Sequence, residues 1–148
     1  MGKIFRLSYI LILSIFLVAC TEHPSQNGDS SSYKIETGEI ITISVASGYT
    51  QMEEVPFKIY KEEKIICEGS FTTKSSVENY LKSLPEENRT KKENINENEF
   101  ILIDEGGQYK GFTFINDTST VIAISYYITK EEIIPFMRTM SIVSETIK

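Results

Sequence analysis

Few side chains in this chain of 148 residues could carry out covalent chemistry. The chain has two cysteines, Cys20 and Cys67, and a single histidine, His23. Serine and cysteine nucleophiles are commonly activated by a histidine that the fold holds against them. His23 lies in a run of polar residues, 21–32, with no apolar neighbour to fix its position. We therefore expect neither a Ser-His-Asp nor a Cys-His mechanism.

The acidic residues form no pattern that indicates a site. Asp104, Glu105 and Asp117 fall at expected turns and lack the spacing of a calcium-binding loop. The glycines after Glu105 lack the lysine of a phosphate-binding loop. With 21 acidic residues, some carboxylate pair for glycoside hydrolysis can always be assembled, here from Glu53, Glu54, Glu131 or Glu132. We expect no catalytic residue, no metal and no cofactor, and no enzyme.

The N-terminal segment 1–19 has the layout of an export signal. Lys3 and Arg6 give a basic start, and a largely apolar run follows from Leu7 to Val18. This run is 12 residues long. It fits a signal core of roughly 7 to 15 residues and falls short of the roughly 18 needed to span a bilayer. The segment therefore predicts an exported protein without a permanent transmembrane helix.

The end of this segment, Leu17-Val18-Ala19-Cys20, resembles the lipobox of bacterial lipoproteins. The resemblance implies that a diacylglycerol is attached to the Cys20 sulfur and that the chain is cleaved just before this residue. Cys20 would then be the lipidated first residue of the mature protein. The expected location is the extracytoplasmic face of the cell membrane, with the lipid as anchor.

Lipidation of Cys20 would leave Cys67 without a disulfide partner in the chain. Cys67 lies in the segment 64–68, where alternation places it on the face of Ile65 and opposite the charged residues. We expect a buried structural thiol rather than a reactive one.

Residues 20–32 are expected to form the lipidated cysteine and a flexible tether, because 21–32 contain no apolar side chain. As a flexible coil this stretch would reach roughly 20 Å. Loss of Lys3 and Arg6 with the signal would change the net charge from −6 to −8. An acidic surface repels phosphate backbones, so we expect no nucleic-acid partner.

Residues 33–148 are enough for one domain with a single core. Alternating apolar residues predict strands over 41–46, 55–59 and 64–68 in its first half. A helix follows, because Val77, Tyr80, Leu81 and Leu84 form one apolar stripe before Pro85. Ser75 and Glu78 are spaced as a capping box.

The second half repeats this succession after a polar segment, 86–99, which we expect to be a mobile, solvated loop. Strands are predicted over 100–103, 112–114 and 122–128, and a helix begins at Thr129 with Glu132 in capping-box register. Its stripe is Ile133, Phe136, Met137 and Met140. The predicted fold class is α+β, with an antiparallel sheet of about six strands covered by two helices.

A shift of 56 residues aligns the two halves without a gap. Phe71-Thr72-Thr73-Lys74 then matches Tyr127-Ile128-Thr129-Lys130, and Val77 matches Ile133. The alignment suggests an internal duplication of a β-β-β-α unit whose two copies share one sheet. Similar patterning that arose by convergence is an equal alternative.

The C-terminal part, from Gly111 through Tyr126 to Ile134, also resembles an uncharacterised domain of anti-sigma-factor-like and lipoprotein-sorting-like envelope proteins. The shared features are a strand, a helix start of the type Thr129-Lys130-Glu131-Glu132, and a short apolar helix. The resemblance implies a role in the cell envelope without a defined chemistry.

Together these features predict a membrane-anchored envelope lipoprotein that acts as a non-catalytic binding module. Its expected partner is an envelope or extracellular protein, engaged through a face of the sheet or through 86–99. The alternative is a membrane-anchored inhibitor or immunity protein that neutralises a cationic enzyme or toxin, which small size and acidity favour. Exposure of Tyr109, Tyr126 or Tyr127 on one face would indicate a specific protein target.

Overall fold

A computed structural model describes residues 28–90 and 92–147. Cys20, His23 and the predicted signal, 1–19, lie outside the described residues. The described chain consists of antiparallel sheets and two α-helices, which confirms the α+β class. Neither of these helices has the length and hydrophobicity that crossing a membrane requires.

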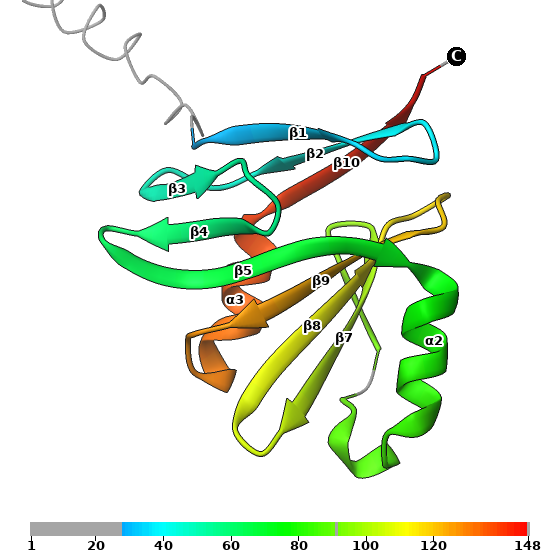
Figure 1. The fold of residues 1–148 in the computed structure, drawn as a ribbon. Helices are drawn as coiled ribbons and strands as arrows, with labels where there is room; N and C mark the ends of the chain where they lie inside the picture. The colour runs from blue at the N-terminus through cyan, green and yellow to red at the C-terminus, as the bar shows by residue number, and fades with distance from the viewer. Residues whose placement is uncertain (1–27, 91, 148) are drawn as a thin grey trace, which may run out of the picture.

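The strands form two sheets rather than one sheet of about six strands (Figure 1). The seven-stranded sheet has the order β3 (Tyr49–Met52), β4 (Phe57–Lys61), β5 (Lys64–Thr73), β9 (Thr120–Tyr126), β8 (Gln108–Phe114), β7 (Asn98–Glu105) and β6 (Glu93–Ile95). The three-stranded sheet has the order β1 (Ser30–Lys34), β2 (Glu39–Ser44) and β10 (Ser141–Thr146). The apolar patterns of the sequence predicted six of these strands and missed β1, β3, β6 and β10, which are short or polar.

The domain begins earlier than predicted, because β1 starts inside the expected tether. Ser31 is buried, and β1 pairs with β2 along its whole length. Hydrogen-bonded hydroxyl pairs replace apolar contacts on the outer side of these two strands. The hydroxyl oxygens of Ser30 and Ser44 are 2.9 Å apart, and those of Ser32 and Thr42 are 2.8 Å apart. Main-chain pairing can thus order a polar segment that has too few apolar side chains to be recognised as a strand.

The two helices lie where their apolar stripes predicted them. Helix α2 (Lys74–Ser83) buries Val77 and Leu81, and it ends before Pro85. Its cap is Thr73 rather than Ser75, since the Thr73 hydroxyl accepts the Ser76 N–H at 3.3 Å. Helix α3 (Lys130–Thr139) has the predicted start, with the Thr129 N–H donating to Glu132 Oε2 at 2.8 Å, and it includes Pro135.

The helices cover opposite faces of the seven-stranded sheet (Figure 1). On one face, α2 packs on alternate residues of β7 and β9, including Ile101, Ile103 and Val121. On the other face, α3 and the three-stranded sheet pack on a larger core that includes Phe100, Leu102, Ile122 and Ile124. One face is therefore covered by α3 and the small sheet together, whereas a single ten-residue helix packs on the other.

This arrangement contradicts the predicted duplication. The 56-residue offset does relate the bounds of α2 and α3. However, the strand order is β4-β5-β9-β8, and the helices that follow β5 and β9 lie on opposite faces. Each unit can be viewed from the side of its own helix, with the strand that leads into the helix pointing up. In this view, β4 lies on one side of β5, whereas β8 lies on the opposite side of β9. The two hairpin–helix units have opposite handedness and cannot be superposed.

The described residues of the segment 86–99, namely 86–90 and 92–99, are folded rather than a mobile loop. They include the 3₁₀ turn η1 (Glu86–Asn88), β6 and the start of β7. Ile95 and Asn98 are buried. The Asn96 side chain donates to the main-chain oxygens of Arg138 and Met140, where α3 ends. A few side chains thus anchor a segment that is otherwise polar, which average composition does not reveal.

Candidate functional site

The main cavity of the described chain is a groove beside α2. Helix α2 covers only part of its face of the sheet, and strands β5, β9 and β8 continue beyond it. The groove has a volume of about 400 Å³, which is within the roughly 300–1,000 Å³ range of small-molecule sites. Its floor is Ser70, Thr72, Ala123 and Ser125, and its walls include Val77 and Tyr80 of α2.

The strand pairing gives the floor its order. Directly opposed residues of an antiparallel pair point to the same face. One row across five strands is Met52, Lys58, Glu68, Ser125 and Lys110. The next row contains Ser70, Ala123 and Phe112. The groove therefore presents small side chains in its middle and larger ones towards its ends.

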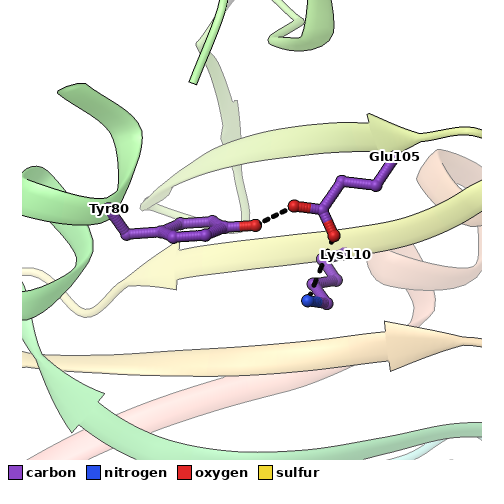
Figure 2. A network of polar contacts seen from close by, with 3 residues as sticks. All are labelled: Tyr80, Glu105 and Lys110. Atoms are coloured by element: carbon purple, nitrogen blue, oxygen red, sulfur yellow. Dashed lines mark hydrogen bonds and ion pairs between the residues drawn. The ribbon is translucent and has the colours of Figure 1, made fainter. Parts of the chain in front are cut away.

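A polar network fixes the wall formed by Tyr80 (Figure 2). The Tyr80 hydroxyl donates to Glu105 Oε1, and Lys110 Nζ lies 3.2 Å from Glu105 Oε2. The Tyr80 ring meets the Phe112 ring edge to face, with 5.8 Å between the two centroids. Lys110 Nζ lies 5.9 Å from the centroid of the Tyr80 ring. Three elements, α2, β7 and β8, thus hold one side chain in place.

The pKa values of this network describe a positioning element rather than a proton-transfer pair. Burial, together with the hydrogen bond to Glu105 and its charge, raises the pKa of Tyr80 to about 12. The same hydrogen bond, aided by Lys110, lowers the pKa of Glu105. Near neutral pH, Tyr80 is a hydroxyl donor and Glu105 an ionised acceptor. Neither group is poised to exchange a proton in that range.

The floor hydroxyls of Ser70, Thr72 and Ser125 form no side-chain hydrogen bond with any other described residue. Some hydroxyls elsewhere in the sheets are paired, such as those of Ser30 and Ser32 with hydroxyls on β2. Such hydroxyls can donate and accept at the same time. They are available to a molecule that enters the groove.

The open face continues from the groove towards the edge of the sheet, and we define it by Met52, Val55, Lys58, Glu68 and Tyr127. Met52 is 52 % exposed, Val55 56 % and Tyr127 50 %. Partial burial and the neighbouring Glu68 carboxylate raise the pKa of Tyr127. Of the three tyrosines singled out from the sequence, Tyr127 is exposed, Tyr109 is half-buried and Tyr126 is buried. Met52 was missed because it ends a short, polar strand. Val55 was predicted to share the buried face of Phe57 and Ile59, and this is wrong, because the residue is exposed before the start of β4.

Cys67 is buried, as predicted. Burial raises the pKa of its thiol to about 12, so it is not a reactive thiolate near neutral pH. It does not share a face with Ile65, contrary to the prediction: Ile59 pairs with Cys67 and Tyr60 with Ile65, which leaves a bulge at Ile66. The bulge reverses the alternation on one side of Cys67.

Three of the other candidate carboxylates, Glu53, Asp104 and Glu132, accept hydrogen bonds within the fold. Glu53 accepts a long hydrogen bond of 3.5 Å from Ser31, and Glu132 accepts the Thr129 N–H. Asp104 accepts the Gly107 N–H at 2.9 Å inside its turn. Within residues 28–90 and 92–147, no three His, Cys, Asp or Glu side chains are placed to hold a metal ion. Cys20, the predicted lipid attachment site, lies outside the described residues.

Comparison with known proteins does not assign the chain to a family. The chain matches no protein-family model, no curated protein and no solved structure. Its function has to be inferred from its own residues and their geometry.

Proposed function

We propose that this chain is a membrane-anchored envelope lipoprotein that binds another protein without catalysing a reaction. The lipid on Cys20 would hold it on the extracytoplasmic face of the cell membrane. The support for this location is the succession of basic start, short apolar run and Leu17-Val18-Ala19-Cys20.

The observation that carries the binding role is the open face. Large apolar side chains gather there in an exposed position: Met52 and Tyr127 lie on either side of the Lys58–Glu68 cross-strand pair, and Val55 lies beside the groove residue Pro56. Exposed apolar groups with a polar surround are typical of protein interfaces. Aromatic side chains such as Tyr127 often provide the anchoring contacts.

The partner expected at this face is an envelope or extracellular protein rather than a nucleic acid. The net charge of −8 that would remain after removal of 1–19 repels a phosphate backbone. The charges within the open face are balanced, because Lys58 lies directly opposite Glu68. Apolar contact, rather than net charge, would therefore provide most of the affinity.

Site-specific photo-crosslinking in living cells tests the binding role. A photoreactive residue replaces Tyr127 or Met52, and the matched control replaces Val143, which is 51 % exposed on the other sheet. Adducts of one discrete mass should form at the first two positions and not at Val143. Equal adducts at all three positions, or none at Tyr127 and Met52, would reject the open face as an interface.

Metabolic labelling with an alkyne fatty acid tests the anchor. The wild type should incorporate the label and Cys20→Ala should not. Cys67→Ala is the matched control, because it removes the other cysteine and should retain the label. An unlabelled wild type, or a labelled Cys20→Ala variant, would contradict the lipoprotein assignment.

A further inference from the structure

We infer that the groove beside α2 is a binding site for an uncharged saccharide. This inference goes beyond the protein partner proposed above and concerns a different part of the same face. It rests on the hydrogen-bonding state of the floor, the charge balance at its ends and the position of its strands within the sheet.

The floor favours a ligand that has hydroxyl groups of its own. Ser70, Thr72 and Ser125 make no side-chain hydrogen bond to other described residues. A purely apolar ligand would displace water from these hydroxyls and leave them unsatisfied, which is unfavourable. Sugar hydroxyls both donate and accept hydrogen bonds, and each can pair with a serine or threonine hydroxyl in either direction.

The charges at the ends of the groove balance in sign. Lys110 forms an ion pair with Glu105, and Glu68 lies directly opposite Lys58 on the neighbouring strand. Neither end therefore carries a net charge that would select an anionic or a cationic ligand. The net charge of the chain, −6, further disfavours anions.

The position of the floor in the sheet disfavours a peptide bound as an added strand. Strands β5 and β9 are interior: β5 pairs with β4 and β9, and β9 pairs with β5 and β8. Their main-chain groups are used in the sheet, and strand addition requires a free edge. A ligand in the groove must bond to side chains.

The walls suit the apolar faces of sugar rings. Val77 and Tyr80 come from α2, Phe112 closes the row of Ser70 and Ala123, and the network with Glu105 holds Tyr80 in place. Rigid apolar walls beside a hydroxyl-bearing floor complement a molecule whose C–H groups and hydroxyls point in different directions.

The test uses the full chain, extracted from membranes in detergent. Four ligands are compared, each a tetramer whose ends are chemically blocked. Two are neutral oligosaccharides, of glucose and of N-acetylglucosamine; one is a charged oligogalacturonate; one is a neutral alanine peptide. Binding is measured by saturation-transfer NMR and calorimetry with ligand concentrations up to about 10 mM, at which weak binding is detectable. At least one neutral oligosaccharide should bind, and the charged saccharide and the peptide should not.

Variants locate the binding. Ser125→Val removes one hydroxyl and should weaken binding about 2- to 10-fold. Ser70→Phe fills the groove and should abolish it. Ser32→Val, on the outer side of the small sheet, is the matched control and should bind as the wild type does. Thermal unfolding of each variant checks that the fold is retained.

The inference is overturned if neither neutral oligosaccharide binds, if the peptide or the charged saccharide binds better, or if Ser70→Phe folds and binds sugar unchanged. These outcomes are separate from those of the proposed function. Crosslinks at Tyr127 with no sugar binding would leave the protein partner in place and reject the saccharide, and the converse result would do the opposite.

Discussion

Thr120 and Glu39 join the two sheets through a hydrogen bond of 2.7 Å, although 81 residues separate them in the chain. Thr120 is buried at the start of β9, and Glu39 begins β2. Its carboxylate accepts the threonine hydroxyl, which makes the bond stronger than one between neutral groups. This contact fixes the small sheet against the large one.

Thr120→Val should therefore lower the free energy of unfolding by about 1–3 kcal/mol, because the variant keeps the shape and removes the donor. Urea denaturation provides the measurement. Thr50→Val, at an exposed position on β3, should change the free energy of unfolding by less than about 0.5 kcal/mol. Equal effects of the two substitutions would show that the contact contributes nothing.

Gly111 and Tyr126 should behave as a coupled pair. A Cβ at Gly111 would lie 2.7 Å from the Tyr126 hydroxyl and 2.6 Å from the Phe100 ring. Gly111→Ala should lower the free energy of unfolding by about 1–3 kcal/mol through overpacking. Tyr126→Phe should be neutral or stabilising, since the hydroxyl is buried without a partner among the described residues. In a double-mutant cycle, Tyr126→Phe should recover part of the loss, and strict additivity would contradict the contact.

Tyr80 should titrate later than an ordinary tyrosine. Its folded pKa of about 12 lies above the usual value near 10, so its contribution to stability is present below pH 10 and is lost as the pH rises towards 12. Ultraviolet difference titration near 295 nm measures the ionisation, with Tyr80→Phe identifying the signal. Glu105→Gln should lower the pKa of Tyr80, because the substitution removes the carboxylate charge that helps to raise it, while burial still raises it.

The opposite sign holds for Glu105 at acid pH. Its folded pKa is lowered, so its contribution to stability is present above the unfolded value and is lost as the pH falls through the folded one. Glu105→Gln should flatten the acid side of a plot of urea midpoint against pH. An unchanged slope would show that the network is not formed in solution.

Asn96→Ala should remove the side chain that caps the end of α3. The expected loss is about 1 kcal/mol, the typical net contribution of a hydrogen bond, because two main-chain oxygens, of Arg138 and Met140, lose their donor. Asn94→Ala, exposed on β6, is the matched control. Similar unfolding midpoints for the two variants would refute the capping role.

The sequence predicts those elements whose own residues carry the signal. Six strands and both helices followed from local apolar patterns. The burial of Cys67 was predicted correctly, but the alternation used for it placed Ile65 on the wrong face. In contrast, β1 and β10 depend on pairing with β2, and neither has enough apolar residues to be recognised alone. Whether the helices share a face depends on strand order, which local periodicity does not contain.

The groove was beyond sequence reasoning for a related reason. Ser70 and Ser125 become neighbours only because β5 pairs with β9 in one register. Tyr80, Glu105 and Lys110 come from three different elements, and the sequence does not show that they meet, although Tyr80 belongs to the apolar stripe of its helix. The open face was partly foreseeable from Tyr127, whereas Met52 carries no pattern and Val55 was predicted to be buried.

The position of β2 between β1 and β10 determines when the domain can finish folding. β2 pairs with Ser30–Lys34 on one edge and with Ser141–Thr146 on the other, so the small sheet joins segments about a hundred residues apart. During synthesis, β1 and β2 can pair with each other, but the second edge of β2 stays open until β10, the last strand of the chain, has emerged.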